Sequence, residues 1–305
     1  VDPAQDFNGS SGQLESAKLA GGQNYRSVEQ RGELDRWVLS ELQLMVGKVT
    51  ECMDAYDNYG ACQSIESFLD GLSNWYVRRS RDRFWAKDRE SVDKSDAYWT
   101  LYECLVTMAK VVAPFVPFVS ETIWRNLSGV FGDQTPESVH LCDYPTANEQ
   151  WQDDVLSERM ALLREIASLG RSARMEAKLK VRQPLALVEV ILASPEHQGW
   201  LADHGKILAN ELNVKEVAYT QDAEEYINYL VQPNFKRVGP RVGKLMPKVK
   251  KWLNTADGAA LLAEMKANGH VSTEIDGQHI ELNRDDLQVR LQAKEGWAAA
   301  QGASS

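Results

Sequence analysis

The chain has 305 residues and a formal net charge of −10, and 43% of its residues are hydrophobic against 26% charged. This composition is typical of a soluble globular protein, and it excludes an intrinsically disordered chain. The length favours two domains, and no apolar run is long enough to cross a bilayer, so we expect no membrane partner.

Four cysteines lie far apart with no Cys-x-x-Cys pair. Three of them fall on the apolar stripes of expected helices, which indicates reduced, packed thiols. No secretory signal opens the sequence, so we expect a cytoplasmic protein. The first residue is Val1, which indicates a processed product or a piece of a longer chain.

Residues 1–32 are expected to form a linker, because residues 1–24 are rich in Gly, Ser, Gln and Asp and show little apolar periodicity. From Glu33 onward, apolar residues recur at three- and four-residue steps, which predicts amphipathic helices. Asp93 or Ser95 suits an N-cap, and Pro117 suits a first helical turn. Five helices are predicted, at about residues 33–56, 60–76, 93–112, 117–127 and 151–169. Because the connecting loops are short or medium, we expect an antiparallel bundle over residues 33–180.

The pattern changes at Pro184, where a β-rich run begins. We expect strands near residues 185–192, 214–219, 226–231, 271–275, 279–282 and 287–291. Helices are expected near residues 195–212, 239–253 and 257–268. Asp276-Gly277 is a strong hairpin-turn signal between two of the strands. The fold class is therefore mainly α, a helix bundle followed by a small α+β domain over residues 181–305.

Cationic side chains gather in three clusters, although the chain as a whole is acidic. The first cluster follows Trp75 and Tyr76, the second ends the fifth helix, and the third contains no acid. The candidate RNA-binding residues are Arg78, Arg79, Arg81 and Arg83 in the first cluster; Arg171, Arg174, Lys178 and Arg182 in the second; and Lys236, Arg237, Arg241 and Lys244 in the third. Arg89, Lys180, Lys248, Lys250 and Lys251 extend these runs.

Arginine binds phosphate through two donors at once, and nearby aromatic residues suit the stacking of bases, so this pattern favours RNA as a partner. The alternative is a set of solvated helix faces whose arginines pair with acidic neighbours. Trp75 and Trp85 lie on an amphipathic helix, which favours core or interface positions over base platforms. The RNA interpretation requires the clusters to converge on one accessible groove.

The sequence contains little that indicates catalysis. The five histidines have no metal-ligand spacing, and there is no glycine-rich phosphate loop or Gly-x-Ser-x-Gly elbow. No metal site is therefore predicted.

Several segments resemble the isoleucyl-tRNA synthetase family. Residues 33–37, 74–85 and 113–121 are similar to its anticodon-binding helical domain. Residues 168–174, 180–185 and 233–244 are similar to the C-terminal region of its eukaryote-like branch. The resemblance covers roughly residues 1–295. The family's His-Ile-Gly-His and Lys-Met-Ser-Lys-Ser signatures and its editing domain are absent from this chain.

The resemblance implies a tRNA-binding fragment without the catalytic core of a ligase that joins isoleucine to its tRNA. The expected partners are isoleucine-specific tRNA and the catalytic domain of the same polypeptide. No cofactor is expected in this chain, because ATP and magnesium would belong to the absent core. The residues leave two other readings open: a helical protein-interaction module with cationic patches, and a complete enzyme with an unrecognised site.

Overall fold

A computed structural model describes residues 25–88, 91–128, 135–192, 194–220, 226–294 and 296–302. The expected linker at residues 1–24 and Arg89 of the first cluster lie outside these ranges. The chain divides into two compact units, Val1–Met160 and Ala161–Ser305. Each unit is described separately below.

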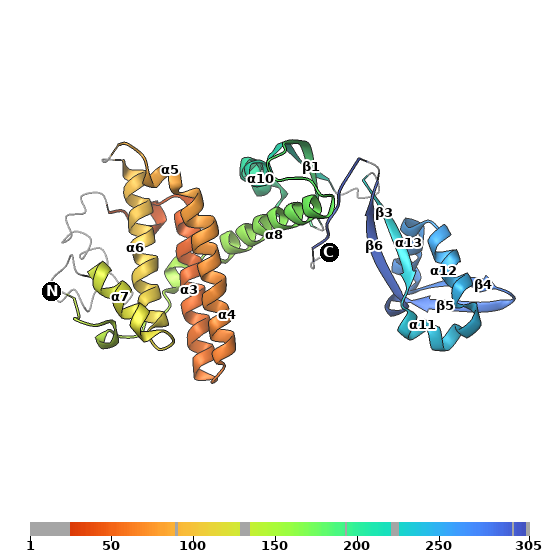
Figure 1. Ribbon diagram of the computed structural model, residues 1–305, viewed down its shortest axis with the longest axis horizontal. Helices are drawn as coiled ribbons and strands as arrows, with labels where there is room; N and C mark the ends of the chain where they lie inside the picture. The colour runs from red at the N-terminus through yellow and green to blue at the C-terminus, as the bar shows by residue number, and fades with distance from the viewer. Residues whose placement is uncertain are drawn as a thin grey trace. The chain divides into compact units, whose positions relative to one another are not determined.

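Unit 1 is built from helices (Figure 1). Its α-helices are α3 (Glu33–Asp54), α4 (Asn58–Asp70), α5 (Arg81–Phe84), α6 (Val92–Val112), α7 (Pro117–Ser128) and the start of α8 (Asp154–Glu176). Short 3-10 segments are η1 (Val28–Gln30), η4 (Val139–Leu141) and η5 (Glu149–Trp151). The predicted helices are present. The N-cap of α6 is Ser91, whose side chain accepts a hydrogen bond from the Lys94 backbone.

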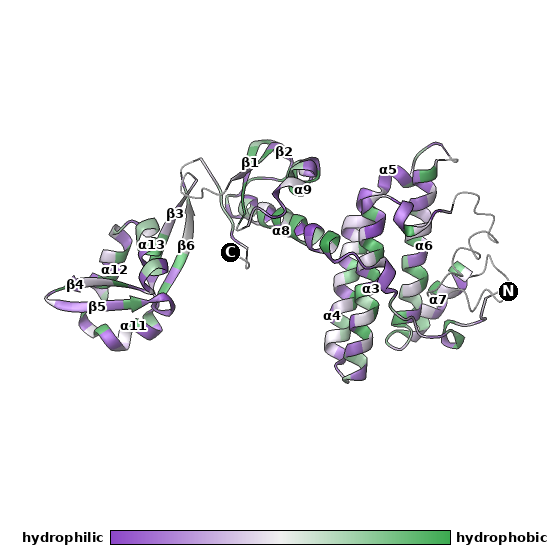
Figure 2. Cartoon of the chain, turned by 180° about the vertical axis from the view of Figure 1, so that it is seen from behind, coloured by the Kyte–Doolittle hydropathy of each residue, from purple (hydrophilic) through white to green (hydrophobic). Residues whose placement is uncertain are grey.

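The core of unit 1 comes from the apolar stripes that the sequence predicts. Figure 2 shows green and purple stripes along the helices of this unit. Trp37, Val38 and Leu42 of α3 are almost fully buried. A second cluster joins α6, α7 and η4 around Trp124 and Val139.

Residues 25–32, which the sequence assigns to the linker, pack onto the bundle. The guanidinium of Arg31 is buried and binds Glu103 of α6, with donor–acceptor distances of 2.6 and 3.1 Å. It also donates to the Thr100 hydroxyl at 2.9 Å, and Tyr25 donates to Glu103 at 3.0 Å. Because a buried charge is costly unless it is paired, this network holds η1 against α6.

A π-helical segment, η2 (Gly71–Val77), continues directly from α4. It lies at the aromatic run that precedes the first cationic cluster. The wider turn buries Leu72, Trp75 and Tyr76 together. Such segments are rare because their backbone hydrogen bonds have unfavourable geometry. The burial of two large aromatic side chains offsets this cost in free energy.

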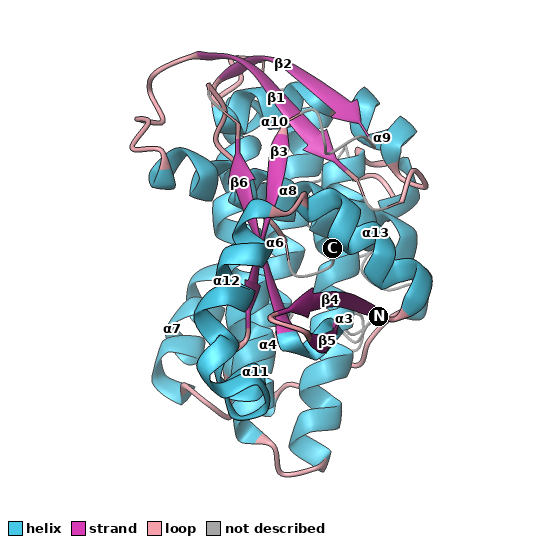
Figure 3. Cartoon of the chain, turned by 90° about the vertical axis from the view of Figure 1, so that its right-hand side faces the viewer, coloured by secondary structure: helices cyan, strands magenta, loops and turns pink. Residues whose placement is uncertain are grey.

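Unit 2 contains the end of α8 and an α+β arrangement. Every strand in the described ranges follows residue 184 (Figure 3). The strands are β1 (Leu185–Ile191), β2 (Val214–Thr220), β3 (Ile227–Pro233), β4 (His270–Ile275), β5 (Gln278–Asn283) and β6 (Leu287–Ala293). The helices are α9 (Gln198–Asp203), α10 (Gly205–Leu212), α11 (Phe235–Val242), α12 (Met246–Thr255) and α13 (Gly258–Asn268), with 3-10 segments η6 (Gly243–Leu245) and η7 (Arg284–Asp286). β1 and β2 pair in parallel, whereas β3–β6 and β4–β5 are antiparallel.

The division between the units falls inside α8, whereas the sequence places the domain boundary near residue 180. The second half of α8 packs against α10. A Cβ added at Gly170 would lie only 2.6 Å from the Leu212 side chain, so helix and side chain are already in close contact. This contact explains why residues 161–176 group with the α+β part.

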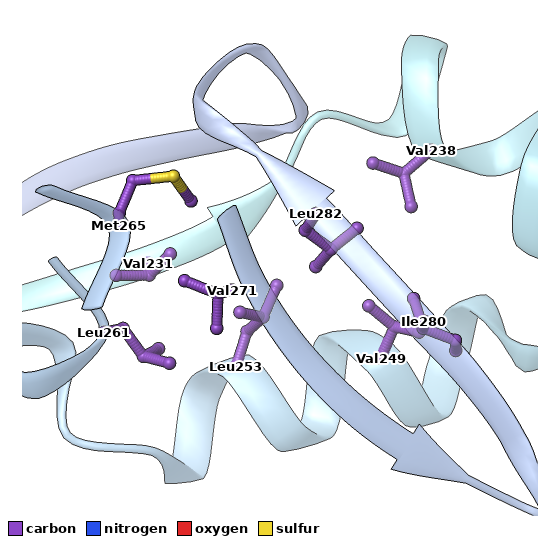
Figure 4. Packing of buried hydrophobic residues seen from close by; sticks show 9 residues of the cluster. All are labelled: Val231, Val238, Val249, Leu253, Leu261, Met265, Val271, Ile280 and Leu282. Carbon is purple, nitrogen blue, oxygen red and sulfur yellow. The ribbon is translucent and has the colours of Figure 1, made fainter. Parts of the chain in front are cut away.

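Turn chemistry shapes the C-terminal part of unit 2. Asp276 and Gly277 have φ values of 56° and 75°, the two positive angles that a tight β4–β5 hairpin requires. The helix expected at residues 239–253 is two helices, because Gly243 takes a φ of 50° between α11 and α12. Val238, Val249, Leu253 and Val271 pack with other apolar side chains into one core (Figure 4).

The structure confirms the mainly α fold class with a bundle followed by a small α+β part. Within the described ranges, no helix combines the length and the apolar character needed to span a membrane.

Candidate nucleic-acid interface

The first cationic cluster runs from the end of η2 into α5. Arg78 and Arg81 are exposed. The Nε of Arg78 donates to the Asn74 carbonyl at 2.8 Å, one turn earlier. The guanidinium carbon of Arg79 lies 5.2 Å from the centroid of the Trp75 ring, a cation–π contact that orients this arginine. Arg78 and Arg81 are therefore the members of this cluster best placed to reach a partner.

Arg83 binds an acid inside the bundle, and its predicted contact with RNA stays a prediction. It forms a bidentate ion pair with the buried Asp35 carboxylate, at 2.9 and 2.7 Å. Its Nε lies 2.9 Å from Asp93, and the Tyr76 hydroxyl donates to Asp35 at 2.6 Å. Burial, aided by the Asp35 charge, raises the pKa of Tyr76, so its hydroxyl stays a donor. The guanidinium of Arg83 thus neutralises a carboxylate inside the bundle.

The two tryptophans beside this cluster have different surroundings. Trp75 is buried in the bundle, as the amphipathic pattern predicts. Trp85 follows α5 and is 78% exposed, so it is not a core residue. An exposed tryptophan beside cationic side chains is the type of residue that dominates binding interfaces.

The second cluster contains one residue with a purely structural role. Arg174 is 3% exposed, and its guanidinium donates to four backbone carbonyls. The donor–acceptor distances are 3.0 Å to Lys180, 3.1 Å to Gln183, 2.6 Å to Leu212 and 3.1 Å to Asn213. This arginine joins the end of α8 to the end of α10. This burial does not favour the predicted contact of Arg174 with RNA.

The other members of the second cluster lie at the surface. Arg171 is partly exposed and pairs with Glu211 at 3.2 Å. Lys178 and Arg182 are exposed in the turn between α8 and β1. Lys178 has a φ of 56°, which places it just past the helix end in the left-handed conformation typical of this position.

The third cluster separates into paired arginines and exposed lysines. Asp286 is 1% exposed and accepts from Arg241 at 2.5 Å, with Arg237 at 3.8 Å. Arg237 also binds Asp285 at 3.0 Å. Both arginines remain about half exposed, so they keep part of their donor surface.

The lysines of this cluster, Lys236, Lys244, Lys250 and Lys251, are exposed on α11, η6 and α12. None of these four pairs with a carboxylate within the part of the chain that the structure describes. Lys248 does pair with Asp276.

Sequence reasoning missed the acids that bind these arginines. Asp35 lies in the first turn of α3, and Asp286 lies in η7, far along the chain from Arg83 and Arg241. A signal exists for Asp35, since an acid in the apolar stripe of a helix requires a buried partner. Identifying that partner requires the tertiary structure.

Over the described ranges, His, Cys, Asp and Glu side chains form no group of three that could hold a metal ion.

Comparison with known families identifies the class of protein to which this helical bundle belongs. A family model described as the anticodon-binding domain of tRNA ligase matches residues 35–191. The chain belongs to this family.

The most similar full-length relatives include isoleucine–tRNA ligases. The chain is 39% identical to that of Clostridium acetobutylicum over 278 residues, which are 91% of this chain and 26% of that protein. It is 40% identical to that of Chlamydia trachomatis serovar D, over 89% of this chain and 26% of that protein. It is 37% identical to that of Thermobifida fusca, over 89% of this chain and 25% of that protein. The resemblance read from the sequence is confirmed, and the chain spans about a quarter of the length of these relatives.

Proposed function

We propose that this chain is the tRNA-docking part of an isoleucine–tRNA ligase. The observation that carries the proposal is the similarity to isoleucine–tRNA ligases over about nine-tenths of the chain, together with the family match across the bundle. In this function, phosphate contacts set the position of the RNA, while unstacked loop bases are read by stacking and by hydrogen bonds to their edges.

The exposed cations of each cluster bind phosphates in this proposal. They are Arg78 and Arg81 in the first cluster, Lys178 and Arg182 in the second, and Lys236 and Lys244 in the third. Arg79, Arg171, Arg237 and Arg241 contribute their remaining exposed donors. Although the chain as a whole is acidic, the local positive charge of each cluster favours the approach of a polyanion.

The second proposed partner is the catalytic domain of the same polypeptide, and Trp85 favours it. A large aromatic side chain that is 78% exposed gains much free energy when a protein surface covers it. Arg78 and Arg81 could then serve both partners, by binding the catalytic domain and by transmitting tRNA docking.

The chain by itself is not expected to activate isoleucine. ATP–pyrophosphate exchange with isoleucine measures this directly, and measurable exchange would favour the alternative of a complete enzyme. The proposal also places the protein in the cytoplasm, in keeping with unpaired cysteines such as the buried Cys52 and Cys104.

Titration of the chain with isoleucine tRNA and with a tRNA of another specificity, at two salt concentrations, tests the proposal. We expect salt-sensitive binding that prefers isoleucine tRNA. Arg78→Ala combined with Arg81→Ala should weaken it about tenfold, because charge-assisted hydrogen bonds are lost. Lys48→Ala is the matched control, since Lys48 is an exposed cation of the same unit that pairs with Glu51 outside the clusters. Binding that ignores salt would favour the protein-interaction module, and no tRNA binding would refute the proposal.

A further inference from the structure

Phe235 is an exposed aromatic residue that directly precedes the third cluster in the sequence. It is the first residue of α11 and is 53% exposed. Val238, one turn later on the same side of α11, is fully buried. Phe235 thus continues the apolar stripe of the helix past the edge of the core, where much of its ring surface remains in contact with solvent.

One ammonium group lies over this ring, and other lysines are close to it in the sequence. The Nζ of Lys250 lies 5.8 Å from the ring centroid, and Lys236 is the next residue along α11. Lys244 and Lys251 are exposed in η6 and α12, which follow α11 directly. Unlike Arg237, Arg241 and Lys248, these lysines pair with no carboxylate among the residues that the structure describes. The surface therefore combines one flat apolar ring with uncompensated positive charge.

This combination fits unpaired nucleotides better than the other polyanions. A phenyl ring stacks on the face of any base that is not already stacked, while ammonium groups bind the phosphates on either side. A duplex keeps its bases stacked inside the helix and would use only the lysines. An acidic protein segment would likewise use the lysines, and its carboxylates would make no use of the ring.

We propose that Phe235 is a stacking platform for an unpaired base of bound RNA, with Lys236, Lys244 and Lys250 on the flanking phosphates. The inference rests on the proposed function, and it adds a contact outside residues 35–191, which the family model matches.

Fluorescence anisotropy with the full chain tests this inference. The probes are a labelled single-stranded RNA dodecamer, the same dodecamer annealed to its complement, and intact isoleucine tRNA. Phe235→Leu preserves an apolar side chain but removes the flat ring, and Phe235→Trp preserves the ring. Phe118→Leu is the matched control, because Phe118 is an 87% exposed phenylalanine on α7, far from the three clusters in sequence.

We expect Phe235→Leu to weaken binding of the single strand by about fivefold to a hundredfold, the range found for loss of one base–aromatic stack. Duplex binding should change less than about twofold, since only the lysine contacts would hold it. The Phe235→Trp and Phe118→Leu variants should bind the single strand and the duplex with the same affinity as the unmodified chain. Thermal unfolding of each variant confirms that it is folded.

Several outcomes would overturn the inference. If Phe235→Leu lost affinity equally for the single strand and the duplex, Phe235 would only support the positions of the lysines. An unchanged affinity of Phe235→Leu, or no binding of the single strand by a chain that binds tRNA, would refute stacking and leave the proposed function intact. Competition by polyglutamate that depends on Phe235 would identify an acidic protein partner instead. Failure of the unmodified chain to bind tRNA would refute both proposals.

Discussion

Arg81 and Arg83 are two residues apart and have different surroundings. Arg83 binds the buried Asp35, whereas Arg81 is exposed on α5. If a guanidinium that pairs with a buried carboxylate moved away to bind another partner, the carboxylate would be left buried and unpaired, which costs free energy. The candidate interface is therefore smaller than the set of cationic residues, and it consists of the side chains that remain at least partly exposed.

Arg174→Met should lower the free energy of unfolding of unit 2 by about 3 kcal/mol, because buried carbonyls at Gln183 and Leu212 lose a charged donor. Arg174→Lys should not restore it, since an ammonium cannot span the same carbonyls. Urea denaturation measures both changes. Lys178→Met is the control, because that side chain is exposed and should change stability little. Unaltered stability of Arg174→Met would contradict the structural role.

Glu121 links α7 to η4 through hydrogen bonds to its carboxylate. It accepts from the Ser138 hydroxyl at 2.8 Å and from the Val139 amide at 3.0 Å, and Arg125 lies 2.7 Å away. Burial alone would raise the pKa of Glu121, but these donors outweigh it and lower the pKa below its usual value. The carboxylate therefore stabilises the fold above the pKa of the unfolded chain, and this contribution is lost as pH falls through the folded-state pKa.

Glu121→Gln should consequently lower stability by about 1 kcal/mol at pH 7, and the difference from the unmodified chain should shrink as the pH falls below 4.5, the ordinary pKa of this group. Urea unfolding at pH 7 and at a pH below 4.5 measures the free energy of unfolding of the variant relative to that of the unmodified chain. A difference that is constant with pH would show that the charge of Glu121 does not contribute.

At the scale of elements, the turn between α3 and α4 carries backbone strain. Tyr56 has a φ of 59° and is 92% exposed, so a bulky residue occupies a left-handed position where glycine is preferred. The sequence predicts that the first helix extends to about residue 56, but α3 ends at Asp54 and the Tyr56 side chain points to solvent.

Tyr56→Gly should raise the free energy of unfolding by up to about 1 kcal/mol, because it removes the steric cost and loses no buried surface. Tyr59→Gly, inside α4, is the matched control and should lower it by a similar amount. Thermal denaturation would reveal both changes, and a loss of stability in the first variant would contradict the strain.

Gly258 begins α13 against the backbone of β3. A Cβ at this position would lie 1.9 Å from the Tyr229 carbonyl oxygen, a distance that atoms cannot adopt. Gly258→Ala should therefore destabilise unit 2 by about 2 kcal/mol or more, as overpacking does. Gly199→Ala, in α9 with open space around it, should be neutral or stabilising. Equal stability of the two variants in urea denaturation would contradict the close contact.

For the whole molecule, the charge distribution predicts the salt dependence of tRNA binding. If about six phosphates are neutralised, the logarithm of affinity should fall against the logarithm of salt concentration with a slope of about −4 to −5. Lys236→Ala combined with Lys244→Ala should reduce the magnitude of the slope by about 1.4. A slope near zero, or one unchanged by the double substitution, would exclude these lysines from phosphate contact.

Most helices and strands follow from the sequence because their causes are local. Apolar periodicity marks α3, and Pro117 marks the start of α7 within its own turn. The π-helical segment and the break at Gly243 escape such reasoning, since a single extra residue or one left-handed angle barely alters the apolar pattern. Their cause is packing against other elements.

By itself, the sequence determined the bundle, the α+β part, the family resemblance and the position of every cationic run. Only the tertiary structure decided which cations remain available. Arg83 and Asp35 are 48 residues apart, Arg174 and Leu212 are 38 apart, and Arg241 and Asp286 are 45 apart. Such pairings arise when distant segments fold together and a buried charge must be satisfied, so no local pattern records them.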